Sequence, residues 1–289
     1  MKEHDNMFPI EKMSKVLQVS RSGYYHWLKS EPSHRTLENR ELTVEIRAIH
    51  ARSKQTYGSP RIAAELNVEN KKASRPRVAR LMKKAGIRSK MTKKYRVSTT
   101  DSNHGFHIAP NLLDRDFRVG EIGRVWVSDI TYIPTAQGWL YLTTVIDLGD
   151  RKVIGWALST TMKAADTTIA AWKMAVINRP ITSNLIFHSD RGVQYACNEF
   201  TNLVKAYTTA TRSMSRTGNC WDNAVAESFF KSMKSEWTKW HQYQSFKQAK
   251  LSVFEYIETW YNVNRRHSAL NYMTPNQYHD FLQTRNLAA

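Results

Sequence analysis

The stretch VWVSDITYIPTAQGWLYLTTVIDLGDRKVIGWALS, residues 125–159, decides the fold. It contains three runs rich in β-branched and aromatic residues, the composition that is typical of β-strands. Turn residues separate the runs, with Gln137-Gly138 between the first two. The stretch therefore predicts three consecutive strands joined as a meander, at 125–133, 139–146 and 152–159.

The chain after this meander alternates between helical and strand patterns. We expect a helix at 164–178, a short buried strand at 185–188, a helix at 196–206, a strand at 208–212, and a last helix that begins near 222. The order βββαβαβα predicts an α/β fold, a mixed five-stranded sheet with helices on its faces. In such sheets polar groups at strand ends gather at one edge.

One acidic residue interrupts the apolar face of the first strand. Val125, Val127, Asp129, Thr131 and Ile133 share a face by period-two alternation. A lone carboxylate among apolar neighbours is costly unless it is paired or binds a metal. Asp129 is therefore a candidate site residue.

A second acidic residue lies on the helix predicted after Gly218-Asn219, for which Asp222 is the expected N-cap. At about 100° per residue, Glu227, Lys231 and Lys234 fall on one polar stripe. This places a carboxylate on a rigid element with two lysines one and two turns further along. The alternative is an ordinary solvated helix face with an i,i+4 ion pair between Glu227 and Lys231.

Three carboxylates are candidates for one site, because the strands that carry Asp129 and Asp190 can lie side by side and Glu227 follows on the last helix. Oxygen ligands without His or Cys favour magnesium or manganese over zinc. Two such ions can serve phosphoryl transfer. Asp190 could instead be an ordinary turn residue, and for Asp147, also at a strand end, Arg151 offers a structural ion pair.

Composition and charge indicate a partner. The 289 residues are 41% apolar and carry a net charge of +18. Residues 1–120 hold 25 Lys and Arg against 12 Asp and Glu, whereas residues 121–289 hold 18 against 13. A basic front half suggests a module that binds a polyanion. No apolar run is long enough to span a membrane, and no signal-peptide pattern is present. Two cysteines give no disulfide framework, which fits a reducing cytosol.

The front half has the pattern of small DNA-binding helices. Residues 8–29 predict a helix-turn-helix in which Ser20 caps the second helix. Ser74 caps a later helix that turns Arg77, Arg80 and Lys84 outward. From residue 71 to residue 96 there are 12 basic residues and no acidic one. A solvated face usually mixes both signs, so DNA binding is favoured over simple solvation.

These features predict five segments along the chain. They are a helix-turn-helix-like segment at 1–36, a basic DNA-binding domain at 37–96, a linker at 97–120, a catalytic core at 121–240, and a helical extension at 241–289. The extension contains an amphipathic helix at 245–260 and then Arg265-Arg266. That pair is either a solvated basic turn or a contact to DNA or a partner.

Three blocks and a tail of this chain resemble the transposases of insertion-sequence family three. The blocks are WVSDITYI at 126–133, HSDRGVQY at 188–195 and SMSRTGNCWDNAVAESFF at 213–230, and the tail is YNVNRRHSALNYMTP at 261–275. Residues 44–88 resemble the second helix-turn-helix segment of that family. The chain looks like the product of the family's second reading frame.

The resemblance implies an RNase H-like integrase core related to retroviral integrases. It implies a DDE site of Asp129, Asp190 and Glu227 with two divalent metal ions, Mg²⁺ or Mn²⁺. The implied activity is cleavage and strand transfer at the ends of a mobile element. Retroviral integrases are similar in placing lysines at the offsets of Lys231 and Lys234 after their Glu, and there these lysines contact the viral DNA end.

The resemblance also implies partners and a location. These are the element's terminal repeats and target DNA in duplex form, a homo-oligomer on DNA, a first-frame protein or frameshift fusion, and the nucleoid of a bacterial cytoplasm. One departure is that 36 residues separate Asp190 from Glu227, where the family commonly has 35. The extra residue falls in 206–212, so we expect the site to tolerate it.

Two alternatives to a transposase remain at this point. One is a DNA-binding or interaction protein with an inactive integrase scaffold, and the other is an RNase H-like nuclease. The intact set of three carboxylates favours an enzyme over the scaffold. The basic front half and the tail favour a transposase over the nuclease.

Overall fold

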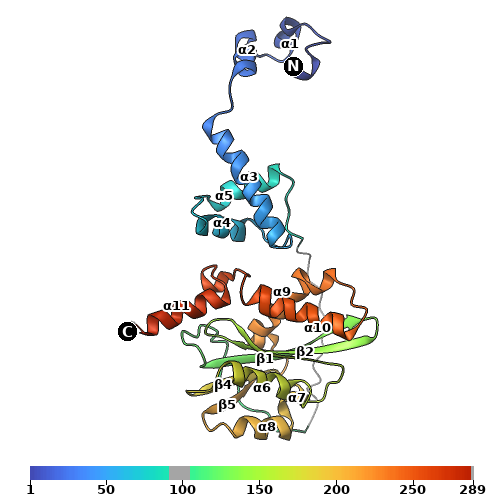
Figure 1. Cartoon of the computed structure of the whole chain (residues 1–289), viewed down its shortest axis with the longest axis vertical. Helices are drawn as coiled ribbons and strands as arrows, with labels where there is room; N and C mark the ends of the chain where they lie inside the picture. Colours follow the sequence, from blue (N-terminus) through green and yellow to red (C-terminus); the bar gives the residue numbers. More distant parts are fainter. Residues whose placement is uncertain (91–104, 288–289) are drawn as a thin grey trace. The chain divides into compact units, whose positions relative to one another are not determined.

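The computed structural model describes residues 1–90 and 105–287, and they form two compact units, Met1–Arg88 and Ser89–Ala289. The end of the basic run and the start of the linker expected at 97–120 lie outside the described residues. Figure 1 shows the helices and strands of both units.

The first unit is helical, and serine side chains begin three of its helices. The hydroxyls of Ser20, Ser33 and Ser74 accept hydrogen bonds from backbone N–H groups three residues further on, as N-caps do. The helices, preceded by a short 3₁₀ turn at Lys2–His4, are α1 (Ile10–Val16), α2 (Arg21–Lys29), α3 (His34–Arg52), α4 (Ser59–Val68) and α5 (Arg75–Lys84).

Helices α3, α4 and α5 contact one another around a small apolar core. Ile46, Ile62 and Val78, one from each helix, are fully buried. Helix α3 begins at His34 because Ser33 caps it. The boundary expected between residues 36 and 37 therefore falls inside this helix.

The second unit is built on a five-stranded mixed sheet of order β3-β2-β1-β4-β5 (Figure 1). The strands are β1 (Val125–Thr135), β2 (Gly138–Asp147), β3 (Val153–Ser159), β4 (Leu185–Ser189) and β5 (Ala210–Met214). The meander β1-β2-β3 is antiparallel, and β4 and β5 add to β1 in parallel. The predicted fold class and the predicted adjacency of the first and fourth strands are confirmed.

Helices cover both faces of the sheet (Figure 1). One face packs against α9 (Ala224–Glu236), α10 (Phe246–Phe254) and a π-helical turn at Glu255–Tyr261. The other packs against α6 (Thr168–Asn178), α7 (Val193–Ala196) and α8 (Asn198–Lys205). Gly155 of β3 permits the close approach of α6, because an added Cβ would overlap backbone atoms of Ala171 and Ala175.

Two segments that the sequence analysis set outside the core belong to it. Tyr243, Tyr256 and Tyr261 of the C-terminal extension are buried in the same apolar cluster as α9. In the segment expected to be a linker, Ala109 and Leu113 are buried against the sheet unit. The last described helix is α11 (Pro275–Leu287), which lies within the helical extension expected at 241–289.

None of the helices in the described ranges, 1–90 and 105–287, is long and apolar enough to cross a membrane.

Candidate active site

Asp129 and Asp190 lie at the same level of two adjoining strands. Strands β1 and β4 run parallel and pair Val127 with His188. Continued by two residues, the same register sets Asp129 opposite Asp190. Asp190 comes directly after the last residue of β4. Neighbouring strands are about 4.8 Å apart. The sheet therefore brings two carboxylates together where β1 continues beyond its partner.

The electrostatics of Asp129 reflect this crowding. Burial raises its pKa well above the usual value, and the charges of Asp190 and Glu227 raise it further. The N–H of Ile130 donates to Asp129 Oδ1 over 2.8 Å and opposes the shift in part. All three predicted carboxylates are thus close enough to influence one protonation equilibrium.

Glu227 reaches this place from the first turn of α9, which packs against β1. The side-chain amide of Asn223 donates to the carbonyl of Ser128 over 3.0 Å, which ties the start of α9 to the residue before Asp129. Glu227 is exposed at the rim of the site, yet partial burial raises its pKa. An exposed carboxylate on a fixed helix can adjust its rotamer toward a ligand.

The two lysines of α9 differ in their surroundings. Lys234 Nζ lies 4.7 Å from the ring centroid of Tyr132, a cation–π distance. Burial lowers the pKa of Lys234, whereas the nearby Asp129 acts in the opposite direction. Lys231 is exposed, and no ion pair joins it to Glu227 among the contacts of the described residues. The expected alternative, a simple Glu227–Lys231 pair, is therefore absent from this conformation.

The carboxylates suit a hard divalent cation. Within the described ranges, no three His, Cys, Asp or Glu side chains already form a metal-binding group. The donors are nevertheless all carboxylate oxygens, the ligands that Mg²⁺ and Mn²⁺ prefer. The charges of Asp190 and Glu227 raise the pKa of Asp129, and a bound cation would relieve that repulsion. The residues present therefore fit the expected metal.

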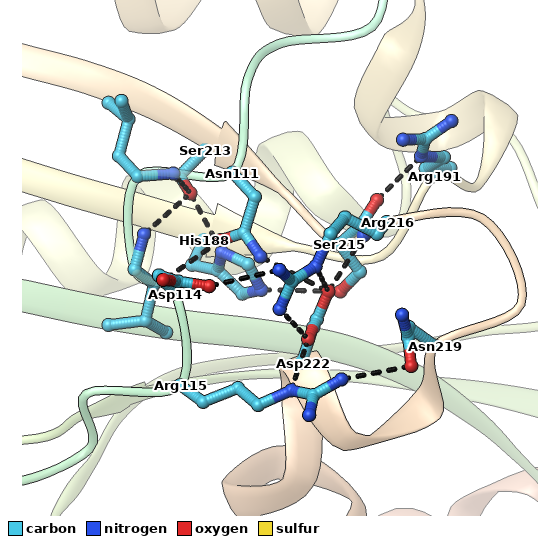
Figure 2. Close-up of polar contacts among 12 residues, drawn as sticks. Asn111, Asp114, Arg115, His188, Arg191, Ser213, Ser215, Arg216, Asn219 and Asp222 are labelled. Carbon is cyan, nitrogen blue, oxygen red and sulfur yellow. Dashed lines mark hydrogen bonds and ion pairs between the residues drawn. The ribbon is translucent and has the colours of Figure 1, made fainter.

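A buried carboxylate fixes the loop between β5 and α9. Asp222 lies in the 3₁₀ turn η2 (Cys220–Asn223), and its side chain is fully buried. Arg115 Nε donates to its Oδ1 over 2.7 Å, and Arg216 donates from Nη2 over 2.9 Å, as Figure 2 shows. Asn111 adds a bond of 3.1 Å to Oδ2. The guanidinium groups hold the pKa of Asp222 well below its usual range.

The same network extends to the strands that carry the site (Figure 2). His188 of β4, next to Ser189, bonds through Nδ1 to Ser213 Oγ over 2.8 Å and through Nε2 to Ser215 Oγ over 3.2 Å. Burial lowers the pKa of His188 to about 4, so the ring is neutral at neutral pH. Arg191 donates to the carbonyl of Ser215. The loop is thereby joined to residues on both sides of Asp190, namely His188 of β4 and Arg191 after β4.

Two structural roles predicted from the sequence are wrong. Asp222 is not the cap of α9, because the N-cap position is Asn223 and Asp222 is buried among arginines instead. Asp147 does not pair with Arg151. It is fully buried and pairs with Arg179, which also binds Asp150. Asp147 therefore has a structural role, as expected, but through a different partner.

Some of the predicted DNA-binding residues are exposed, and others bind groups of the protein itself. Arg80 and Lys84 of α5 are exposed. Arg77 is half-buried and donates to Glu38 over 2.7 Å, which joins α5 to α3.

Arg265 and Arg266 are buried, which corrects their prediction as surface contacts to DNA. Only 4% of Arg265 is exposed, and its guanidinium makes two bonds of 2.7 Å to Glu236. Arg266 donates to the carbonyl of Tyr272 and to Gln277. Both arginines hold the C-terminal segment together.

Sequence reasoning missed Asn111, Arg115 and His188. Their roles depend on partners between 25 and 111 residues away, which residue spacing does not reveal. The one available signal was the density of polar residues in the blocks around Asp190 and Asp222.

Comparisons with known proteins agree with this architecture. An "Integrase core domain" family matches residues 121–220, a second family of that description matches residues 208–275, and an "HTH-like domain" matches residues 36–95. The transposase InsF for insertion sequence IS3A of Escherichia coli strain K12 is 37% identical over the whole chain and 98% of its own length. An uncharacterized 31 kDa protein of insertion element IS600 from Shigella sonnei is 39% identical, over 91% of this chain and 96% of its own length.

A solved structure is similar at lower identity. In the simian T-cell lymphotropic virus intasome in complex with PP2A regulatory subunit B56 gamma, one chain is 13% identical with a TM-score of 0.44. The match covers 81% of this chain and 74% of that chain.

The sheet, its acidic edge and the matching integrase core define a DNA-processing polynucleotidyl transferase. The chain belongs to the family of insertion-sequence transposases that includes the InsF proteins of IS3. The family predicted from the sequence is thereby confirmed, and the transposase is favoured over the inactive scaffold and the nuclease.

The buried charge of Asp222 makes a prediction about stability. Its folded pKa is lowered, so its ion pairs stabilise the fold fully above the unfolded pKa of about 3.9, and this contribution is lost as pH falls through the folded pKa. Arg115 and Arg216 are 43% and 44% exposed, so screening reduces the effect. Asp222→Asn should lower the free energy of unfolding by about 2 kcal/mol at pH 7.

Urea unfolding at several pH values measures this difference. The gap between wild type and Asp222→Asn should shrink as pH falls below about 4. Asp280→Asn, at an exposed carboxylate of α11, should change stability little at any pH. A gap for Asp222→Asn that is the same in acid and at neutral pH contradicts the role of its charge.

Proposed function

We propose that Asp129, Asp190 and Glu227 are the catalytic carboxylates of this transposase and that they hold two Mg²⁺ or Mn²⁺ ions. The reaction is cleavage of a DNA strand at the end of the insertion sequence and its joining to target DNA. The single observation that carries this proposal is geometric: the parallel register of β1 and β4 sets Asp129 and Asp190 level, and α9, which carries Glu227, packs against β1. The fold gathers three like charges at one sheet edge where stability alone would separate them.

The residues have distinct tasks in this reaction. Asp129 and Asp190 are held by adjoining parallel strands, so the distance between their carboxylates is set by the backbone. Glu227 completes the set from a helix and can follow the substrate. Ions bound there supply Lewis-acid stabilisation of the charge that develops on the phosphate and activate the attacking oxygen. The protein orients the strand, which is a large part of phosphoryl-transfer catalysis.

Two lysines of α9 extend the proposal to the DNA backbone. Lys234 is poised between the ring of Tyr132 and the charge of Asp129, and Lys231 is exposed one turn nearer to Glu227. A lysine holds a phosphate as a point charge. We assign both lysines to the strand next to the scissile bond.

Duplex recognition is assigned to the helical unit. Arg80 and Lys84 of α5 are exposed on a helix whose buried side is apolar. Cations on one exposed face are suited to phosphate contacts. The proposal includes element ends and target DNA as ligands, assembly as a homo-oligomer on DNA, a first-frame partner or fusion, and work at the bacterial nucleoid. The exposed apolar residues of α1 and α2, Val16 and Trp27 among them, are available to such partners.

Substitution of the carboxylates tests the site. Asp129→Asn, Asp190→Asn and Glu227→Gln should each reduce end cleavage by roughly a thousandfold or more, because a lost ligand removes several kcal/mol of barrier stabilisation. Glu199→Gln, at an exposed carboxylate of α8, is the control.

Thermal unfolding gives a second readout. Mg²⁺ should raise the Tm of wild type, whereas Asp129→Asn should lose that rise and be more stable without metal, since one of three like charges is gone. An Asp190→Asn protein that cleaves at the normal rate contradicts the assignment.

The lysines predict a loss of rate without a loss of fold. Lys231→Gln combined with Lys234→Gln should lower end cleavage by about tenfold or more through misplacement of the strand. Thermal stability and Mg²⁺ binding should stay near wild type. Lys247→Gln with Lys250→Gln, two exposed lysines of α10, controls for net charge. Wild-type cleavage by the double variant would remove the lysines from the DNA path.

The basic helix predicts a change in salt dependence. Each neutralised phosphate contributes about −0.9 to the slope of log affinity against log salt. In the full chain, Arg80→Gln with Lys84→Gln should make the slope for duplex DNA shallower by roughly two units. A matched pair on the sheet unit, Lys173→Gln with Lys205→Gln, should leave it nearly unchanged, since these exposed lysines belong to α6 and α8 and not to the basic helix. Equal slopes for both pairs would show that the charges of α5 are only solvated.

A further inference from the structure

The most exposed tryptophan of the chain lies six residues before Glu227. Trp221 is 67% exposed, although large aromatic side chains usually gain most from burial. It occupies the 3₁₀ turn η2, between the loop from β5 and the first residue of α9. Nothing in the catalytic assignment uses this side chain.

The exposure of Trp221 does not come from a loose loop. The next residue, Asp222, is buried and is held by two arginines. The residue after that, Asn223, bonds to the carbonyl of Ser128. Figure 2 shows the guanidinium groups of Arg115 and Arg216 meeting at Asp222. A turn fixed in this way holds the neighbouring indole outward.

The turn that carries Trp221 lies near the carboxylates. Consecutive Cα atoms are about 3.8 Å apart, so the Cα atoms of Trp221 and Asn223 are separated by at most about 7.6 Å. Asn223 is hydrogen-bonded to the residue that precedes Asp129. Trp221 therefore lies within a few nucleotides' reach of a phosphate bound at Asp129.

Two partly exposed arginines belong to the clamp that fixes this turn. Arg115 binds Asp222 and Asn219, Arg216 binds Asp222 and Asp114, and both side chains keep more than two-fifths of their surface exposed. Aromatic side chains in a basic setting bind unpaired nucleotides by stacking, whatever the base. A second protein surface would cover an exposed tryptophan equally well, but the turn is joined through Asn223 to the residue before Asp129, where the proposed function places the DNA end, and this favours a nucleotide.

We propose that Trp221 is a stacking platform for an unpaired base of the DNA end, next to the nucleotide whose phosphate is cut. The proposal rests on the catalytic assignment of Asp129, Asp190 and Glu227, because that assignment brings the DNA end to this turn. Stacking on the indole replaces the base stacking that is lost when the end of the duplex opens. The clamp around Asp222 keeps the platform in place while the strand moves.

Two DNA probes test this role in the full chain. One is a blunt duplex, and the other is the same duplex with a few unpaired bases at the cleaved end. Binding is measured by fluorescence anisotropy in a chelating buffer, so that cleavage does not occur. Trp221→Ala should weaken binding of the frayed probe by about five- to 150-fold, the range for base–aromatic stacking, and change the blunt probe much less.

Three controls make the test specific. Trp221→Phe should recover most of the preference for the frayed probe, since a phenyl ring also stacks. Trp240→Ala, at another exposed tryptophan of the same unit, should bind both probes as wild type does. An abasic nucleotide at one unpaired position should weaken wild type and leave Trp221→Ala unaffected, which identifies the base that stacks.

Other outcomes overturn the proposal. If Trp221→Ala weakens binding of both probes equally, Trp221 is a general DNA contact. If Trp221→Ala leaves binding of both probes unchanged, or if the wild-type protein binds neither probe, DNA is excluded from this surface. Self-association that is lost in Trp221→Ala, seen by sedimentation while DNA binding persists, would make the surface an interface between copies. Binding is measured without metal, so a negative result for Trp221 does not affect the cleavage test of the carboxylates. A negative result in the cleavage test likewise leaves the ratio of binding to the two probes measurable.

Discussion

Repulsion between carboxylates is the constraint around which the sheet unit is arranged. Asp129 and Asp190 are held level by parallel pairing of β1 with β4, and Glu227 adds a third negative charge to the same field. Such an arrangement costs free energy in the absence of a cation, because burial and like charge both disfavour the ionised forms. It persists because buried strands and helices on both faces of the sheet determine the backbone around it.

The loop before α9 is fixed by interactions of the opposite kind. Asp222 is buried with arginines on two sides, so its charge is compensated and its pKa is lowered. Asp129 carries a raised pKa in the same unit. The contrast agrees with two roles: Asp222, which has arginine partners, stabilises structure, whereas Asp129 is one of the carboxylates that we propose bind the metal ions. Asp147 follows Asp222 in having an arginine partner, Arg179, although the charge of Asp150 and burial raise its pKa.

Sequence patterns identified the parts of the site that depend on local order. Alternation in the first strand singled out Asp129, and helical spacing put Glu227, Lys231 and Lys234 on one stripe. These inferences need only the periods of strand and helix. The order of elements was also sufficient to predict the sheet and its class, since β4 returns beside β1 through a helical crossover.

The same patterns failed where distant segments meet. Asp222 has the chemistry of a helix cap, but Arg115, more than a hundred residues earlier, offers it a stronger interaction. Arg265 reads as a surface cation beside Arg266, yet Glu236 on α9 draws it into the interior. Residues 97–120 were expected to be a linker because they are polar, although Asn111 and Arg115, in the described part of that segment, hold the loop. In each case at least one partner lies far away in sequence, although Arg216, the strongest partner of Asp222, is only six residues before it.

When a flexible substrate binds beside a rigid loop, the substrate must change shape, because the loop cannot. The turn that carries Trp221 is tied to β1 through Asn223, to the segment around Arg115, and to Arg216 in the loop before it. Moving it would break several charge-assisted hydrogen bonds at once, each worth more than a neutral one. Opening the last pairs of a duplex is cheaper, because an unpaired end loses only a few stacking contacts. On the function proposed above, the DNA end is therefore the partner that deforms, and a fixed aromatic surface next to the carboxylates is well placed to receive the base that this deformation releases.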